Sequence, residues 1–377
     1  MKALHLATVR PTNRIPSTHR GFRTSESAAA IFNSRWWRRV FAMVLLGSLL
    51  GCRSTPPTAR LARFEFQSPH MGTLFTITLY ASNPAMARAA ADAAFAKVAT
   101  LDRMMTDYDP ESELMRLSGR PVGTPTRVSA ELFDILQESQ RVAQLSSGAF
   151  DVTVGPVVRL WRRARRAETL PPAGQLARAR DSVGWQKLHL DPRQQTVTLL
   201  ATNMQLDLGG IAKGYAADQA LAVLHSRGID RALVAASGDI AAGAAPPGEA
   251  GWRVAIGLPV AGVVSTNTLL LANAAVSTSG DAEQFVVIGD QRYSHIIDPR
   301  TGVGLTERWQ VSIIARHATQ TDAFATAVSV LGGPAGIKLV ESQPGLAAII
   351  YRVDHGRLEL FQSRRAQRFL KISPAVK

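Results

Sequence analysis

The chain has 377 residues, of which 46% are hydrophobic, and this is enough apolar material for a sizeable core, so a largely disordered protein is excluded. The formal net charge is +14, but eight Lys and Arg residues against a single Glu place half of that excess in residues 1–51. The rest of the chain is only mildly basic, so no nucleic acid is expected as a partner. The single cysteine excludes an internal disulfide.

The N-terminal segment, residues 1–51, is predicted to be a signal peptide of the lipoprotein type. Arg38-Arg39 precede an apolar stretch at 40–50 that is too short to span a bilayer comfortably. The stretch ends in Leu-Leu-Gly-Cys52, the pattern of a bacterial lipoprotein cleavage site. We therefore expect export, a lipid on Cys52 and a location on a bacterial membrane, facing the periplasm or another extracytoplasmic side. The paired arginines also resemble a twin-arginine signal, so both export routes stay open.

The body of the chain, residues 62–377, follows a short tether at 52–61 and is predicted to be one α+β domain. Asn83-Pro84 is typical of a helix start, and an apolar face continues from there to Met105. Charged residues 159–180 contain Pro171-Pro172 and predict the end of a helix and a surface loop. Further helices are expected at 129–142 and 321–331 and from Pro334 on, and strands at 75–79, 232–235, 252–256, 268–271, 284–288, 293–297, 311–315, 347–351 and 358–361. The irregular alternation favours a mixed α+β body over a regular parallel barrel.

Residues 206–218, Leu-Asp-Leu-Gly-Gly-Ile-Ala-Lys-Gly-Tyr-Ala-Ala-Asp, predict a strand that stops at a glycine pair and a helix that follows it. Gly209 and Gly210 let backbone N–H groups approach a ligand at a helix N-terminus, which favours negative charge. Lys213 can add a charge for a phosphate, and Asp207 can accept hydrogen bonds from a base or a ribose. The segment indicates a nucleotide site, although it is not a P-loop. A tight turn with a solvent-facing lysine is the alternative, and on the nucleotide interpretation Lys213→Ala would leave the stability of the free protein nearly unchanged.

Two later segments carry residue types that suit metal binding or proton transfer. Asp322 and Thr326 lie four residues apart, so a helix places them on one face, where they offer hard oxygen ligands for Mg²⁺. An exposed first helical turn would explain the same pair. His295 ends a predicted strand and is a candidate general base, and Asp298 could orient a partner or cap the turn that follows. A structural histidine is the alternative there.

Taken in order, these segments resemble the ApbE family of FAD:protein FMN transferases, which are exported flavin transferases. The similarity begins at Met71-Gly72-Thr73 and reaches the predicted helix at 321–331. The segments that carry it are Tyr108–Leu114, Ala149-Phe150-Asp151, 206–218, Ser277–Gly280, His295–Gly302 and Thr321–Ala327. The resemblance implies a single domain with a mixed, mainly antiparallel sheet and packed helices.

The resemblance also implies a role for each matching residue. FAD would be contacted by Met71, Tyr108, Ala149, Phe150, Asp151, Asp207, Lys213 and Ile297. Mg²⁺ would be bound by Asp322, Thr326 and a backbone oxygen of Gly210. His295 fits a general base held by Asp298, and the FMN phosphoryl group would pass from FAD to a Thr or Ser hydroxyl of an exported or membrane flavoprotein, with release of AMP.

Two alternatives stay open beside FMN transfer. One is hydrolysis of the FAD pyrophosphate to FMN and AMP, because the same metal and phosphate groups serve with water as the nucleophile. The other is a flavin-binding lipoprotein without turnover, against which Asp322 and Thr326 beside His295 argue. The chain also departs from the family's usual Asn-x-Gly-Gly-Asp, with Ala-Ala-Ser-Gly-Asp at 235–239, and this departure concerns the shape of the flavin or acceptor pocket.

Overall fold

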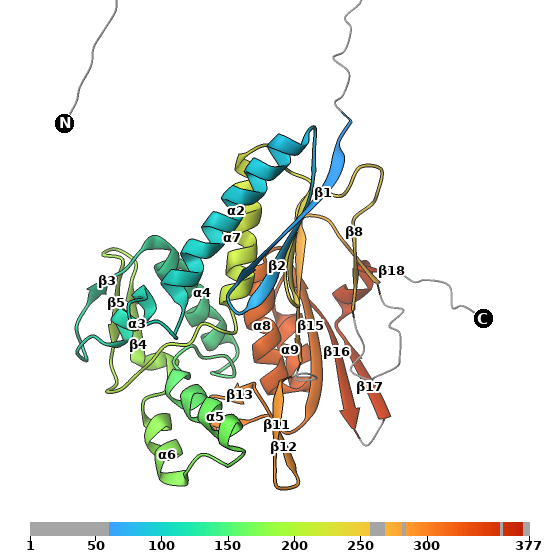
Figure 1. Ribbon diagram of the computed structural model, residues 1–377. Coiled ribbons are helices and arrows are strands. Elements are labelled where there is room, and N and C mark those ends of the chain that lie inside the picture. Colours follow the sequence, from blue (N-terminus) through green and yellow to red (C-terminus); the bar gives the residue numbers. More distant parts are fainter. Residues whose placement is uncertain (1–59, 257–267, 281–283, 355–356, 372–377) are drawn as a thin grey trace, which may run out of the picture. The chain divides into compact units, whose positions relative to one another are not determined.

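The computed structural model describes residues 60–256, 268–280, 284–354 and 357–371 (Figure 1). The predicted signal peptide, with Cys52, and most of the predicted tether lie outside these residues. In the part that is described, no helix combines the length and the apolar character needed to cross a membrane.

An eight-stranded sheet forms the centre of the body, with the strand order β1-β2-β6-β7-β10-β15-β16-β17. Each neighbouring pair in it is antiparallel. The strands are β1 (Ala62–His70), β2 (Thr73–Ala81), β6 (Ala232–Ala236), β7 (Asp239–Ala242), β10 (Ala274–Gly280), β15 (Arg308–Ala315), β16 (Ala347–Asp354) and β17 (Arg357–Gln362). The predicted α+β class with a mainly antiparallel sheet is confirmed.

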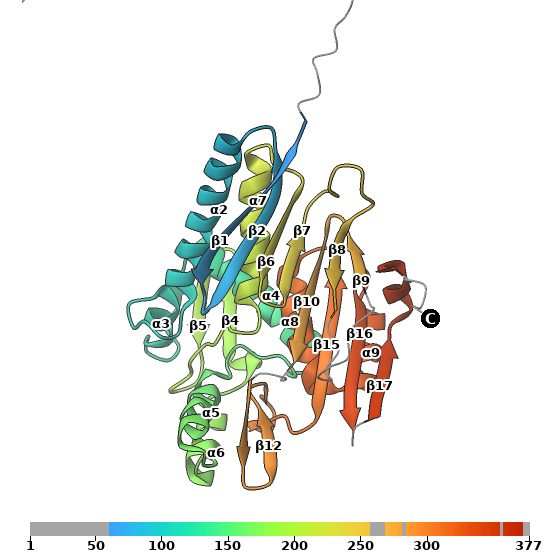
Figure 2. The same cartoon turned by 45° about the vertical axis from the view of Figure 1, so that its right-hand side comes forward.

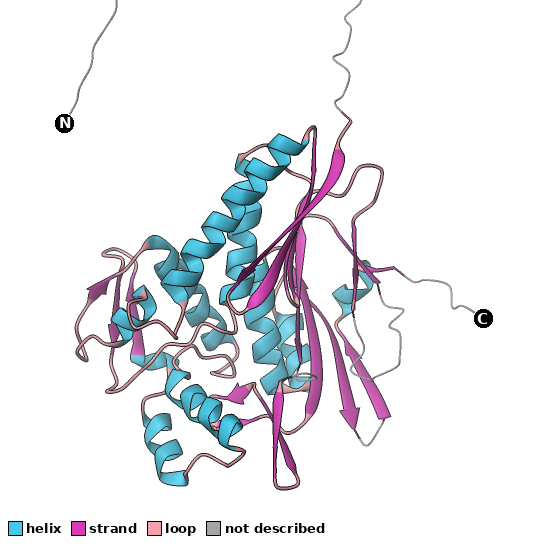
Figure 3. Cartoon of the chain, in the orientation of Figure 1, coloured by secondary structure: helices cyan, strands magenta, loops and turns pink. Residues whose placement is uncertain are grey.

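Both faces of the sheet are covered, and the two-residue period of the strands divides the core accordingly. On one face lie the helices α2 (Pro84–Met105), α7 (Ala212–Ser226), α8 (Ala318–Leu331) and α9 (Gly333–Ser342) (Figures 1 and 3). In β15, Val311 and Ile313 pack toward these helices, whereas Ile314 packs toward the opposite face. The opposite face is covered in part by a small sheet of β8 (Trp252–Ala255), β9 (Thr268–Leu271) and β18 (Leu370–Lys371).

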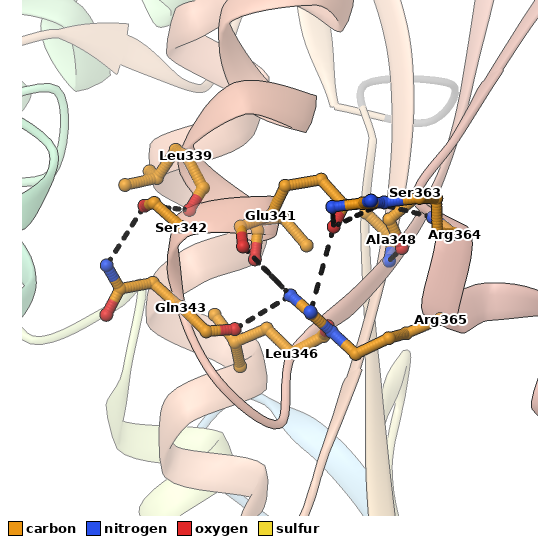
Figure 4. A network of polar contacts seen from close by, with 10 residues as sticks. Leu339, Glu341, Ser342, Gln343, Leu346, Ala348, Ser363, Arg364 and Arg365 are labelled. Carbon is orange, nitrogen blue, oxygen red and sulfur yellow. Dashed lines mark hydrogen bonds and ion pairs between the residues drawn. The ribbon is translucent and has the colours of Figure 1, made fainter.

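Arg365 closes the C-terminal end of α9 (Figure 4). The last carbonyl groups of a helix have no partner within the helix, and a basic side chain can supply one. The Arg365 guanidinium donates to the carbonyl oxygens of Val340 and Gln343, each at 2.9 Å, and to that of Leu346 at 2.7 Å. Because Arg365 follows β17, these hydrogen bonds tie the edge of the sheet to the helix layer.

A second group of elements packs beside the helix layer (Figure 2). It contains α3 (Glu113–Ser118), α4 (Ala130–Leu145), β3 (Thr126–Arg127), β4 (Leu188–Asp191), β5 (Thr196–Leu199), α5 (Gly155–Ala167), α6 (Ala173–Asp181) and the hairpins β11 (Phe285–Ile288)–β12 (Gln291–Ser294) and β13 (Ile297–Asp298)–β14 (Val303–Gly304). Val157, Trp161 and Ile297 form an apolar cluster between α5 and the hairpins. The indole of Trp161 also donates to the carbonyl of Gly302 at 2.8 Å.

Two local predictions differ from the structure. The helix end predicted within residues 159–180 is present, because α5 ends at Ala167, but the loop is confined to 168–172, and Pro172 directly precedes α6, where its fixed φ suits a helix start. Residues 206–208 form no strand before the glycine pair, because only Gln205 makes an isolated bridge, to Val154. The helix after the glycine pair is present as α7.

Candidate active site

A cavity of about 570 Å³ lies where α5, the N-terminal end of α7, α8 and the segment between β12 and β14 meet. Most of the residues predicted for the site line this cavity. They are Tyr108, Ala149, Phe150, Asp151, Asp207, Gly210, Lys213, His295, Ile297, Asp322 and Thr326. Met71 and Asp298 are not among the lining residues.

The close contact between α7 and α8 fixes how the two helices lie against each other at the cavity. A Cβ atom on Gly214 would lie 2.2 Å from the carbonyl oxygen of Ala318, so only glycine permits this approach. The Gly214 N–H donates to the carboxylate of Asp322 at 3.0 Å. Asp218, also in α7, accepts hydrogen bonds from the backbone N–H groups of Ala318 and Thr319, each at 2.8 Å, and thereby caps α8. These contacts place the first turns of α8 against the glycine-rich segment.

Lys213 lies between two buried carboxylates. Its Nζ is 2.8 Å from Oδ2 of Asp239 and 3.7 Å from Oδ2 of Asp322. Burial would lower the pKa of Lys213, but the negative charges of Asp322 and Asp239 outweigh it and raise this pKa, so the lysine stays protonated. Burial, followed by the charge of Asp239, raises the pKa of Asp322 to about 7, and Lys213 acts in the opposite direction. The alternative of a solvent-facing lysine is therefore wrong.

Hard oxygen donors gather beside this lysine. Asp322 is 5% exposed and, like Thr326, lines the cavity from α8. A Cβ atom on Gly210 would lie 2.9 Å from Oγ1 of Thr326, so the glycine lets the backbone come close to this hydroxyl.

The donors match the preference of Mg²⁺ for carboxylate, hydroxyl and carbonyl oxygens. Within the described ranges no three His, Cys, Asp or Glu residues group as metal ligands, so the expected set depends on Asp322 together with the neutral oxygens of Thr326 and Gly210. The buried, lysine-paired carboxylate of Asp239 stands next to this set. The residues present therefore fit a single Mg²⁺ ion.

Asp207 lies in the cavity wall and belongs to a second charged cluster. The sequence did not predict the other members of this cluster, Arg162 and Asp107. The carboxylate of Asp207 accepts hydrogen bonds from Arg162 of α5 at 2.9 Å and from the backbone N–H of Gly209 at 2.8 Å. Arg162 also pairs with Asp107, and its guanidinium lies 4.7 Å from the ring centroid of Tyr108. Burial and the charge of Asp107 raise the pKa of Asp207, and Arg162 opposes the shift.

Tyr108 is 77% exposed, so its ring is held at the cavity rim by Arg162 rather than by core packing.

The sequence does contain a signal for Arg162. In α5 it lies four and eight residues after Val158 and Val154, which also line the cavity, so the three share one helix face. The charged residues and Pro171-Pro172 of the 159–180 stretch mask this periodicity in the sequence.

His295 is oriented by a backbone group. Its Nδ1 donates to the carbonyl oxygen of Gln284 at 3.0 Å, which leaves Nε2 as the nitrogen that can accept a proton. Asp298 instead accepts hydrogen bonds from the backbone N–H and the guanidinium of Arg300, both at 2.9 Å. The prediction that Asp298 holds His295 is corrected: in the described residues Asp298 caps the turn, and Gln284 orients the histidine.

The remaining predicted contacts line the cavity or lie outside it. Asp151 accepts hydrogen bonds from Thr153 and from the backbone N–H of Trp185 at 2.8 Å, so its carboxylate holds a neighbouring loop, and burial raises its pKa. Phe150 packs close to Gly210. Met71 forms the turn between β1 and β2 with a φ of 49°, outside the cavity lining. Its contact to FAD stays a prediction.

The fold and the cavity together define an α+β protein with a site suited to the phosphates of a nucleotide. The ApbE family pattern matches residues 71–350, and the chain belongs to the ApbE family. It is similar to the FAD:protein FMN transferase of Klebsiella pneumoniae (strain 342), with 29% identity over 341 residues, 88% of this chain and 97% of that protein. The FAD:protein FMN transferase of Treponema pallidum (strain Nichols) is 31% identical over 322 residues, 81% of this chain and 89% of that protein.

Solved structures agree with this membership. The flavin transferase ApbE from Vibrio cholerae superposes with a TM-score of 0.75 at 27% identity and covers 82% of this chain and 100% of that one. The apo form of the Pseudomonas stutzeri flavinyl transferase ApbE gives a TM-score of 0.75 at 26% identity, with 85% of this chain and 100% of that one covered.

Proposed function

We propose that this chain is an Mg²⁺-dependent FAD:protein FMN transferase, which moves FMN from FAD to a Thr or Ser hydroxyl of an exported or membrane flavoprotein and releases AMP. The observation that carries the proposal is a single cavity that holds Lys213, Asp322 and Thr326 together with His295. Family membership and the names of the relatives support the same activity.

Phosphoryl transfer depends on positioned charge more than on covalent catalysis. Asp322, Thr326 and the carbonyl oxygen of Gly210 would hold the metal, which supplies charge neutralisation on the pyrophosphate. Lys213 adds a positive charge, because the carboxylates of Asp239 and Asp322 keep its amino group protonated. Asp207, held by Arg162, lies where it can accept a hydrogen bond from a base or a ribose hydroxyl.

In the proposed reaction the acceptor hydroxyl oxygen attacks the phosphorus atom of the FMN half of FAD. A new P–O–C ester bond forms, and the bond from this phosphorus to the bridging oxygen breaks, so AMP leaves with that oxygen. Nε2 of His295 takes the hydroxyl proton, because Nδ1 is committed to the carbonyl of Gln284. A protein hydroxyl in this position, rather than water, distinguishes transfer from hydrolysis.

The direct test is incubation of the purified protein with FAD, Mg²⁺ and candidate acceptors, namely exported flavoproteins of the source organism. Mass spectrometry should show an FMN adduct on a Thr or Ser residue, and the adduct should vanish with EDTA. Release of FMN and AMP without an adduct on any acceptor would identify a hydrolase instead. FAD binding without either product would identify a non-catalytic flavin-binding protein.

We also propose that the mature protein is anchored by a lipid on Cys52 and faces the extracytoplasmic side of a bacterial membrane. The support is the Leu-Leu-Gly-Cys pattern behind a short apolar stretch in the sequence. Cys52→Ser should abolish lipidation and release the protein from the membrane fraction. A Cys52→Ser protein that is still cleaved and still membrane-bound would contradict the anchor.

A further inference from the structure

The helices α5 and α6 carry a large excess of positive charge. Residues 155–181 contain seven arginines against Glu168 and Asp181, a net of +5. The arginines are Arg159, Arg162, Arg163, Arg165, Arg166, Arg178 and Arg180. Within the part of the chain that the structure describes, only Arg162 among them forms an ion pair. Clustered arginines without carboxylate partners create a positive potential that attracts anions.

Arg165 connects this charge to the cavity. It is half-buried and lines the cavity one turn after Arg162. Two buried acids of the cavity wall already pair with other cations, since Asp207 pairs with Arg162 and Asp239 pairs with Lys213. In the described residues Arg165 has no such partner. Its charge is therefore left for an anion that enters from outside.

The neighbours of Arg165 extend the charge onto the surface. Arg163 and Arg166 are exposed, do not line the cavity and have no ion pair among the described residues. We call Arg163, Arg165 and Arg166 the basic surface of α5. A nucleotide inside the cavity could contact only Arg165 of these three. A ligand that uses all three must extend from the cavity onto the outside of the protein.

We propose that the basic surface of α5 binds an acidic segment of the acceptor protein and guides its Thr or Ser hydroxyl into the cavity. The inference rests on the proposed function, because transfer to a protein requires a macromolecular partner at the cavity mouth. Arg165 is the innermost contact and selects an acidic residue near the target hydroxyl. Arg163 and Arg166 steer the acidic segment by charge before it docks.

The position of the surface favours a protein partner over a membrane. The described chain begins at Arg60, and β1 enters the body at the end opposite to α5 and α6 in both views (Figures 1 and 2). Seven residues separate Cys52 from Arg60 in the sequence, and the chain between the two spans at most about 28 Å when fully extended. The basic surface of α5 therefore lies at the end of the body away from the start of β1, which follows the proposed lipid anchor in the chain, and it is left for the acceptor.

Binding of a short labelled peptide tests the proposal without turnover. The probe carries one threonine flanked by aspartates, and its control has asparagine at each aspartate. Fluorescence anisotropy should show that the full-length protein binds the aspartate peptide, that the double variant Arg163→Glu/Arg166→Glu binds it at least about tenfold more weakly, and that added salt weakens it too. Arg227→Glu, a charge reversal at the exposed C-terminal end of α7, should leave peptide binding unchanged.

Other outcomes would overturn the inference. Equal affinity for the two peptides, or an equal loss in Arg227→Glu, would remove the basic surface of α5 as the recognition element. Binding to phosphatidylglycerol vesicles that depends on Arg163 and Arg166, with no binding of the peptide, would assign the surface to the membrane. A lower melting temperature alone would show that these arginines only stabilise the end of α5.

FAD titration and acceptor kinetics distinguish a failure of the docking surface from a failure of the proposed function. The Arg163→Glu/Arg166→Glu protein should bind FAD with the wild-type affinity, because neither side chain lines the cavity. With a working acceptor, its KM for that acceptor should rise at least about tenfold while kcat changes little. Peptide binding without FMN transfer would refute the proposed function and leave the docking surface standing, whereas transfer that ignores the double variant would refute only the docking surface.

Discussion

Replacement of Lys213 by methionine should destabilise the free protein strongly, because the lysine is the cation that compensates two buried acids. Methionine keeps the apolar stem and removes only the ammonium group. The Nζ of Lys213 is 2.8 Å from Asp239, whose side chain is 6% exposed, and 3.7 Å from Asp322. Removing one partner of a buried pair costs roughly 3–5 kcal/mol, and the 28% exposure of the lysine side chain favours the lower end, about 3 kcal/mol.

The loss should depend on pH with a definite sign. The pKa of Asp322 is raised by burial from 3.8 to about 7, so the folded state binds this proton more tightly than the unfolded state. A carboxyl of this kind costs stability as the pH rises through its folded pKa. Lys213 lowers the pKa of Asp322, so removal of the lysine raises this pKa further. The pH range over which the free energy of unfolding falls then becomes wider. The loss in Lys213→Met should therefore be smaller at about pH 5, where Asp322 is protonated and only Asp239 loses its cation, than at about pH 8.

Thermal unfolding at both pH values is the measurement, with Lys338→Met as the control at an exposed position of α9. A loss of about 3 kcal/mol corresponds to a decrease in Tm of roughly 6 °C for a body of this size. Added Mg²⁺ should raise the Tm of Lys213→Met more than that of the wild type, because a divalent cation can compensate the same acids. Equal melting of Lys213→Met and wild type at about pH 8 would refute the ion-pair reasoning.

Three further predictions concern neighbouring positions. Asp322→Asn should abolish Mg²⁺-dependent turnover and leave FAD binding measurable at reduced affinity; wild-type rates at saturating Mg²⁺ would exclude Asp322 as a ligand. Arg162→Met should weaken FAD binding about tenfold and lower stability more at about pH 8 than at about pH 5, since Asp207 loses its cation and protonates; titration and melting at both values check this. Ser237→Gly should raise the free energy of unfolding by about 1 kcal/mol in denaturant titration, because Ser237 has a φ of 57°; a loss of stability would contradict the strain.

The residues proposed to bind the phosphates and the metal could be predicted because the sequence patterns that indicate them are local. Glycines at 209 and 210, a lysine one turn later and an acid and a hydroxyl four residues apart are patterns that a short window contains. The structure brings Gly210, Lys213, Asp322 and Thr326 to one cavity. The glycine at 214 differs from these, since the need for glycine there becomes visible only where Ala318 packs against it.

The partners of these residues could not be predicted, because they come from distant segments. Asp218 belongs to the segment 206–218, yet the groups it caps lie about a hundred residues later, at Ala318 and Thr319. Arg162 meets Asp207 only because α5 packs over the glycine-rich segment, and no periodicity in either stretch specifies that encounter. Long-range pairs of this kind depend on the topology, which propensity and spacing do not determine.

The backbone at 237 and 238 explains why the turn before β7 tolerates a serine at 237, in the segment where the chain departs from the Asn-x-Gly-Gly-Asp pattern. Ser237 adopts the left-handed conformation at φ 57°, and the next residue, Gly238, takes the close contact, since a Cβ there would lie 2.7 Å from the carbonyl oxygen of Thr278. A side chain at 237 costs backbone strain only, whereas one at 238 would push β7 from β10. Asp239 follows directly and pairs with Lys213, so the turn must hold its shape to keep the lysine in place. Strain at 237 is therefore tolerable in this chain, while Gly238 is required to hold the ion pair.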